Sequence, residues 1–302
     1  MKRKHLNLLL LVLVAALVIA VVLSDEEEAP PPPLTNLDSE AVTKISIEYP
    51  EQAAIRLEKQ DSQWQIVEPV RVIADPVEVG ALTALAYRET SLSYPAAEVD
   101  LERLGLKPPQ WSIQLDDTTL HFGNKEPLQD RRYIQVGETV FLANDPPSTA
   151  LDADYSDLVH PKLMPEGTPE ITLIETPDVK LEQSNDVQWQ VTPASADHGP
   201  DARAKLLAHW ENARSLWRTR FDPATEEQID NDFIRVRFGD REVEYLVLQR
   251  DPQLKLLRTD LDVVYTLAPK YGIDLFEIQK PPQDPKVGEN SVKAPAENAE
   301  QE

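Results

Sequence analysis

Histidines are the first residues to examine for chemistry, because imidazole is a common metal ligand and titrates near neutral pH. The chain has five, at His5, His121, His160, His198 and His209. No two of them are four residues apart, the His-x3-His spacing that brings two ligands to one helix face. The pattern therefore predicts no metal site and no catalytic histidine.

Two of the histidines lie in recognisable elements. His121 alternates with apolar Leu120 and Phe122, which predicts the solvent face of a strand. His209 stands beside Trp210 on the flank of a predicted helix, where we expect it to be partly buried or at the surface.

Carboxylates are abundant, with 53 Asp and Glu residues, so only geometry can single out a pair able to catalyse hydrolysis. Two runs, Asp116-Asp117 and Asp152-Ala153-Asp154, are rich in oxygen ligands. Both lack the central glycine and terminal glutamate of a calcium-binding loop. We expect both runs to cap turns instead.

Other catalytic and cofactor motifs are missing from the sequence. There is no cysteine, which excludes thiolate catalysis, disulfides, cysteine-bound metals and lipid attachment through an N-terminal cysteine. With nine glycines, the chain has no phosphate-binding loop, no Rossmann glycine run and no Gly-x-Ser-x-Gly elbow. We predict no catalytic residue, no cofactor and no metal.

Arginines gather near aromatic residues at two places in an otherwise acidic chain. One is Asp130-Arg131-Arg132-Tyr133, and the other is formed by Arg214, Arg218 and Arg220 around Trp217. Such clusters could hold an anionic partner. The simpler interpretation, which we favour, is that these arginines stack on neighbouring aromatic rings and pair with local acids.

The net charge of −23 excludes one class of partner. Affinity for nucleic acids comes largely from lysine and arginine neutralising phosphates, and this acidic surface would repel them. We predict no nucleic-acid binding.

A membrane anchor is predicted at the N-terminus. Residues 6–23 contain one polar residue, Asn7, and as a helix would span about 27 Å, close to the thickness of a bilayer core. Basic residues precede the run and Asp25 to Glu28 follow it, which places the N-terminus in the cytoplasm and the bulk of the chain outside, periplasmic or extracytoplasmic. A cleaved signal peptide is the alternative, but its apolar region is usually shorter and Val22-Leu23-Ser24 is a poor cleavage site.

Two further segments lack the apolar side chains that a core requires. Residues 25–40 are acidic and then proline-rich, which predicts an extended stalk. Residues 280–302 carry four prolines and no aromatic residue, which predicts a disordered tail.

The folded part contains an internal repeat. Gln63-Trp64-Gln65-Ile66 recurs 125 residues later as Gln188-Trp189-Gln190-Val191, and proline follows each run. We expect two similar domains, residues 41–160 and 171–279, joined by a linker at residues 161–170. In each, Trp64 or Trp189 should point into the core of an antiparallel sheet.

Each repeat also predicts one main helix and several further strands. Asp75-Pro76 opens a helix that should run to about Glu89, and Gly199-Pro200 opens one whose apolar face is Leu206, Trp210, Ala213 and Trp217. Short helices are predicted at Asp100–Leu104 and from Asp222. The remaining predicted strands are 42–49, 54–59, 64–67, 111–115, 119–122, 133–136, 140–142, 171–174, 179–182, 189–191, 233–238, 243–248, 254–258 and 263–267.

The pattern resembles the family of domain of unknown function 4340. The resemblance covers roughly residues 45–278 and rests on the N-terminal anchor, the Trp-Gln-Ile run, Ala74-Asp75, Asp100-Leu101 with Gly105-Leu106-Lys107-Pro108, Phe122-Gly123-Asn124 and Tyr133. It implies an exported, membrane-tethered protein, often encoded beside ABC-type transport components related to gliding-motility systems. It implies no catalytic residue. The second repeat lacks the Gly-Leu-x-Pro turn and the Phe-Gly-Asn run.

The sequence thus predicts an α+β protein of two tandem similar domains, each an antiparallel sheet with one main packed helix, after an N-terminal transmembrane helix. Our leading hypothesis is a non-catalytic, extracytoplasmic accessory or binding subunit of a transport or envelope assembly, with ABC-type transporter subunits or other envelope proteins as partners. The alternatives are a hydrolase of envelope polysaccharide or peptide that uses unidentified carboxylates, and ligand capture between the two domains with a hinge near Pro161 to Pro169.

Overall fold

The computed structural model describes residue 5 and residues 13–14, 33–127, 130–145, 154–184, 186, 188–194, 199–225 and 232–278. Nearly all of the predicted anchor, the stalk up to residue 32 and the tail lie outside these residues. No helix in the described ranges is both long enough and apolar enough to cross a membrane. By their contacts, the residues group into two compact units, one of Met1–Arg56 with Gly80–Leu151 and one of Leu57–Val79 with Asp152–Glu302.

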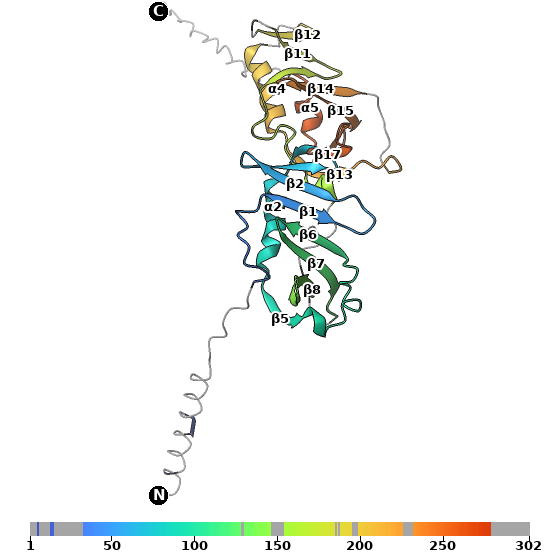
Figure 1. Cartoon of the computed structure of the whole chain (residues 1–302). Helices are drawn as coiled ribbons and strands as arrows, with labels where there is room; N and C mark the ends of the chain where they lie inside the picture. Colours follow the sequence, from blue (N-terminus) through green and yellow to red (C-terminus); the bar gives the residue numbers. More distant parts are fainter. Residues whose placement is uncertain are drawn as a thin grey trace, which may run out of the picture. The chain divides into compact units, whose positions relative to one another are not determined.

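The first sheet has nine strands and is largely antiparallel (Figure 1). Its order is β4-β3-β2-β1-β6-β7-β8-β9-β5. The strands are β1 (Lys44–Glu48), β2 (Ile55–Gln60), β3 (Gln63–Glu68), β4 (Val72–Ile73), β5 (Thr90–Pro95), β6 (Trp111–Leu115), β7 (Thr118–Lys125), β8 (Arg131–Val136) and β9 (Thr139–Asn144).

The second sheet has eight strands in the order β12-β11-β10-β14-β15-β16-β17-β13. All neighbouring strands of this sheet pair antiparallel. The strands are β10 (Ile171–Glu175), β11 (Lys180–Gln183), β12 (Trp189–Thr192), β13 (Ser215–Arg220), β14 (Phe233–Phe238), β15 (Arg241–Gln249), β16 (Leu254–Arg258) and β17 (Val263–Leu267).

The two sheets share one strand order. Without β4, the first sheet consists of a three-strand meander, β1 to β3, beside a four-strand meander, β6 to β9, and β5 lies at the far edge next to β9. In the second sheet, β13 lies at the corresponding edge, next to β17. A helix precedes this edge strand each time, α2 (Pro76–Thr83) or α4 (Pro200–Asn212), and β13 begins 125 residues after β5. The two-sheet α+β architecture is therefore confirmed.

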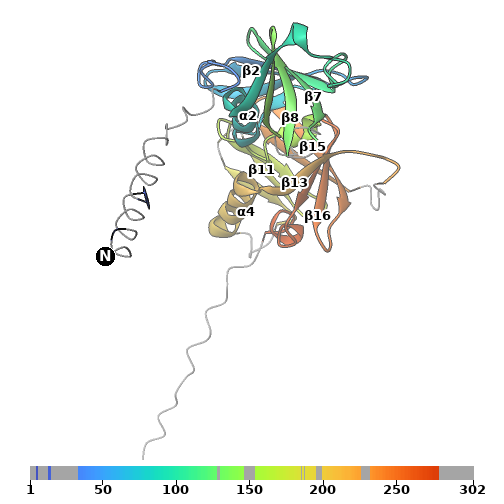
Figure 2. The ribbon, with the colours of Figure 1, turned by 90° about the horizontal axis from the view of Figure 1, so that it is seen from below.

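Helical residues cover one face of each sheet (Figure 2). In the first unit, Leu82 of α2 is buried with Leu85 and Ala86, which belong to the 3-10 helix η1 (Ala84–Tyr87). In the second unit, the fully buried Trp210 of α4 contacts the ring of Tyr245 on β15. Burial of these apolar side chains is the main force that holds helix to sheet.

The chain also crosses the first sheet between two of its strands. It leaves the edge strand β5 and re-enters at β6, so residues 96–110 connect two strands that three others separate. In the second sheet, β13 and β14 are likewise separated by three strands, and residues 226–231 of the segment between them lie outside the described residues. Phe221 follows β13 and packs on a cluster formed by Leu246, Leu248, Leu257 and Val264.

His121 is half-buried, and its Nδ1 is buried, which differs from the predicted position on the solvent face of a strand.

Both main helices are shorter than predicted. The first ends at Thr83 and tightens into η1, because residues 86–88 are drawn into hydrogen bonds with Leu34 and Thr35. The second ends at Asn212, because the backbone of Ser215 binds the carbonyl of Pro161 and the chain then pairs with β17. Trp217 consequently lies on β13, about half exposed at 47%, and not on a helix.

The two predicted short helices are turns in the described residues. Around Asp100–Leu104 single turn bonds end at Gly105, whose φ of +68° suits glycine. The segment from Asp222 forms one turn to Thr225, and residues 226–231 lie outside the described residues. A further short helix, α3 (Tyr155–Leu158), and α5 (Tyr271–Asp274) were not predicted.

The repeated tryptophans are not core residues. Trp64 and Trp189 are only half-buried, whereas Ile66 in the first repeat is fully buried. β3 and β12 lie at or next to a sheet edge, where fewer neighbouring strands are available to cover a large ring.

Candidate functional site

The histidines do not converge. His121 is on β7, His209 on α4 with its Nδ1 3.1 Å from the carbonyl oxygen of Asp274, and His160 follows α3, while His198 lies outside the described residues. Within the described ranges, no three His, Asp or Glu side chains are grouped so as to hold a metal ion.

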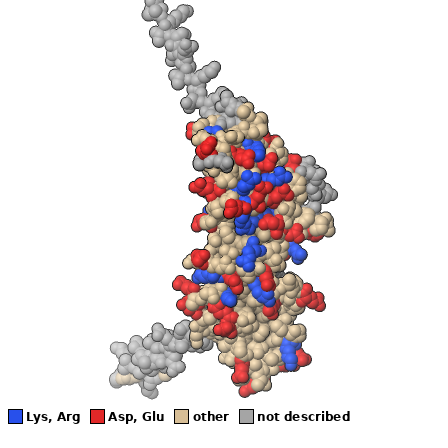
Figure 3. Space-filling view, turned by 45° about the horizontal axis from the view of Figure 1, so that its top comes forward, with Lys and Arg blue, Asp and Glu red and all other residues tan. Residues whose placement is uncertain are grey.

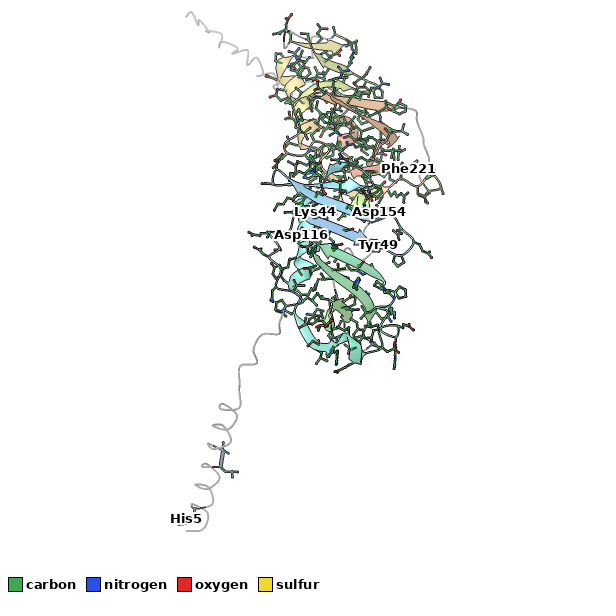
Figure 4. The ribbon with its side chains drawn as sticks, viewed as in Figure 1. His5, Lys44, Tyr49, Asp116, Asp154 and Phe221 are labelled. Carbon is green, nitrogen blue, oxygen red and sulfur yellow. The ribbon has the colours of Figure 1, made fainter. Side chains whose placement is uncertain are left out.

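The predicted turn acids do cap backbone. Asp116, with a φ of +48°, follows β6 and lies close to Lys44 of β1 (Figure 4). Its carboxylate accepts hydrogen bonds from the backbone of Thr43 at 3.1 Å and of Lys44 at 2.9 Å. Asp154 forms a capping box with Asp157 at the start of α3, and Asp152 and Ala153 lie outside the described residues.

The arginines of β8 form ion pairs with nearby acids. The simpler interpretation predicted this pairing. Arg131 pairs with Glu126 at 2.7 Å. Arg132 is buried and pairs at 2.6 Å with Asp145, which also contacts Lys125. These partners lower the pKa of Asp145 against the opposing effect of burial. The cluster presents no free cation to a ligand.

The outer surface of the second sheet is also internally neutralised. Acidic and basic side chains from β10, β11, β14 and β15 pair across strands, and Figure 3 shows basic and acidic atoms intermixed over the face in view. The paired residues are Lys180, Glu182, Arg237, Glu242, Arg235, Glu175 and Glu244. Exposed ion pairs of this kind contribute little to stability.

The arginines around Trp217 separate into two kinds. Arg214 and Arg220 are exposed and form no ion pair with a described residue. Arg218 turns inward, with 11% of its side chain exposed, and its Nη2 lies 3.6 Å from Oδ2 of Asp75 and donates to the carbonyl of Asp157 at 2.5 Å. Its Nε is buried with no hydrogen-bond partner among the described residues.

Arg218 is the centre of a charged cluster in the second unit, which is the best candidate for a functional site. Asp75 is buried at the start of α2, where its Oδ1 accepts a hydrogen bond from the backbone of Val77 at 3.0 Å. Glu78 stands one turn later and Asp157 belongs to α3. Asp75 therefore pairs with the guanidinium of Arg218, and the charges of Glu78 and Asp157 also interact with it.

This crowding shifts the protonation of the cluster. Burial, and then the neighbouring charge of Asp75, raises the pKa of Glu78. Burial likewise raises the pKa of Asp157, although its side chain reaches the surface. Burial lowers the pKa of His160.

Sequence reasoning identified Arg218 and His160 but did not place them together. Asp75 appeared in the sequence only as a residue that opens a helix. Nothing in the spacing connects positions 75, 157 and 218, because they meet only through tertiary pairing.

Comparison with known proteins gives one match. A protein-family model described as "Domain of unknown function (DUF4340)" matches residues 64–226, more than half of the chain. No curated protein and no solved structure matches the chain. The matched range includes the Trp64 run, the helix start at Asp75 and the turn at Gly105.

Proposed function

The chain belongs to the DUF4340 family, whose function is unknown, and from this we propose that it is a membrane-anchored, extracytoplasmic accessory subunit that binds other envelope components without catalysing a reaction. The observation that carries the proposal is the apolar run of residues 6–23 between a basic tip and an acidic stalk. The finer architecture, two duplicated domains held beyond the membrane by that stalk, is part of the proposal.

The described surface supports a binding role. Large apolar side chains are exposed on both edge strands, Leu92 and Tyr94 on β5 and Leu216 and Trp217 on β13. Aromatic residues at protein surfaces are common in binding interfaces. We propose ABC-type transporter subunits or other envelope proteins as partners.

Membrane topology can be tested with single cysteines, because the chain has none of its own. Lys4→Cys probes the cytoplasmic tip, and Glu138→Cys probes an exposed turn between β8 and β9. A membrane-impermeant maleimide should label Glu138→Cys in intact cells and Lys4→Cys only after lysis. Labelling of Glu138→Cys only after lysis would overturn the proposed orientation.

Partners can be tested by mild crosslinking of native membranes followed by purification of the chain. Recovery of transporter subunits above the level seen with an unrelated single-pass protein is the expected result. A chain that is always recovered alone would contradict the accessory role.

A hydrolase is the second candidate, and the grouping of Glu78, Asp157 and Asp75 around Arg218 is the observation that favours it. If the cluster is catalytic, the purified chain should release reducing ends or free amines from isolated envelope polymers. Glu78→Gln should then abolish the release, and Glu242→Gln, on the exposed sheet surface, should not. No release by the wild type would eliminate this candidate.

A further inference from the structure

Residues 157–163 form a segment, here termed the clasp, that is bonded along both sides within the second unit. On one side, the backbone of Asp75 donates to Leu158 at 2.8 Å and that of His160 donates to Ile73 at 3.0 Å. On the other, Leu163 donates to Ala213 at 3.0 Å and Ser215 donates to Pro161 at 2.9 Å. The clasp thereby positions Asp157 beside Arg218.

His160 occupies the middle of the clasp in a state that requires neutral imidazole. Its Nδ1 accepts a hydrogen bond from the backbone N–H of Lys162 at 3.1 Å. An imidazolium has hydrogen on both nitrogens and cannot accept this bond. The charged groups that act on His160 are Asp75, Arg214, Lys162 and Arg218, three cations against one carboxylate, so a proton on the ring adds repulsion as well.

Glu78 faces the other charges of the same cluster. Asp75 and Asp157 repel its carboxylate, and Arg218 attracts it. Asp154 also acts on Asp157 from the start of α3. Neutralising Glu78 leaves two carboxylates with one guanidinium, which reduces the repulsion across the contact between α2 and the clasp.

We propose that the clasp is a pH-sensitive element, in which protonation of His160 loosens its backbone pairing and protonation of Glu78 tightens it. The directions of the pKa shifts agree with this. The pKa of His160 is lowered in the fold, so its contribution to closure is lost as pH falls from the ordinary value of 6.5 through the lowered value. The pKa of Glu78 is raised, so closure is gained as pH falls from the raised value to the ordinary 4.5.

The two effects are separable by substitution. His160→Asn retains an acceptor near the position of Nδ1 but does not titrate, and Glu78→Gln keeps the size of the side chain without its charge. His209→Asn is the matched control, since His209 lies on α4 outside the clasp.

The test is hydrogen exchange, measured by mass spectrometry on the full chain in lipid nanodiscs and corrected for intrinsic rates, at about pH 7.5 and about pH 4.5. This interval reaches from above the ordinary pKa of the imidazole down to that of the carboxyl group. For peptides covering residues 158–163, the quantity compared is the protection factor at the lower pH divided by that at the higher pH. This ratio should be about threefold higher in His160→Asn than in the wild type. In Glu78→Gln the same ratio should be about threefold lower than in the wild type. In His209→Asn it should equal the wild-type ratio. Peptides from α4 report whether each variant is folded.

Identical pH dependence of the clasp in His160→Asn and the wild type, with α4 protected in both, would overturn the proposal. So would a pH response that appears equally in the clasp and in α4, because it would then reflect the stability of the whole unit.

Discussion

At the scale of single residues, the chain neutralises nearly all of its described interior charge locally. Arg132 with Asp145 and Arg258 with Asp260 are pairs in which the arginine is buried. Arg218 differs, because its charge interacts with Asp75, Glu78 and Asp157, and its buried Nε has no hydrogen-bond partner in the part of the chain that the structure describes. An excess of acid around one cation makes this position sensitive to substitution.

Arg218→Met should destabilise the protein strongly. Loss of the guanidinium leaves Asp75 buried without its ion partner, and removing one member of a buried pair costs about 3 kcal/mol or more. Chemical denaturation monitored by circular dichroism measures the change in the free energy of unfolding. Arg237→Met, from an exposed pair with Glu242, is the control and should have a much smaller effect. Equal effects of the two substitutions would show that the Asp75 pair is not specifically stabilising.

At the scale of elements, the crossing from β5 to β6 depends on glycines of β7 and of the crossing itself. A Cβ atom on Gly123 of β7 would strike the carbonyl oxygen of Leu104 and approach Leu106 Cγ at 2.9 Å. Gly105 has a positive φ and lies against the side chain of Asn124. A hydrogen bond holds the two segments together, because the backbone N–H of Asn124 donates to the carbonyl oxygen of Leu104 at 2.8 Å. The Gly105 turn and the Phe-Gly-Asn run of the sequence are therefore two sides of one contact.

Gly123→Ala should lower stability by about 1–3 kcal/mol, because the backbone at Leu104 cannot move aside as a flexible side chain would. The same change at Gly80, in α2 with no neighbour within 4 Å of the added Cβ, should raise stability by about 0.5–1 kcal/mol through the helix preference of alanine. Thermal unfolding of the two variants gives the comparison. If Gly123→Ala is neutral, the packing of the crossing on β7 is looser than described.

At the scale of the whole molecule, the two contact units are interleaved along the chain. Leu57–Val79 groups with Asp152–Glu302, although the repeat places it in the first half of the sequence. The bonds of Ile73 and Asp75 to the clasp, and the Asp75 pair with Arg218, account for this grouping in part. The domain boundaries predicted at residues 160 and 171 stay predictions.

A fragment that begins at Asp152 should therefore be less stable than the same residues in the full chain. It lacks Asp75, so Arg218 loses the carboxylate with which it pairs at 3.6 Å, and the carbonyl of Leu158 loses its donor. Urea unfolding should show a lower midpoint for the fragment when it is followed by the fluorescence of Trp210 in chains whose other tryptophans are replaced by phenylalanine. The full chain carrying Asp75→Asn should move part of the way toward the fragment. An unchanged midpoint would mean that the second repeat is stable by itself.

The sequence alone determined much of this protein, and for a physical reason. Alternation of apolar and polar residues depends only on neighbours along the chain, so strands such as Trp111–Leu115, Phe233–Phe238 and Leu254–Arg258 have the predicted bounds. The family resemblance rests largely on turn residues, whose conformations also depend on their neighbours along the chain. Composition excluded cysteine chemistry, and spacing excluded glycine-loop sites.

Tertiary structure decided the rest. β5 and β13 carry few of the alternating apolar residues that mark a strand, and they exist because β9 and β17 supply the hydrogen bonds at a sheet edge. Pairing with β17 also ended the predicted second helix before Trp217. The cluster around Arg218 joins residues more than 140 positions apart, and no periodic pattern records a contact of that range. The preference of a segment for helix or strand depends on residues adjacent in the sequence. Burial of a charge depends on which distant segments the fold brings beside it.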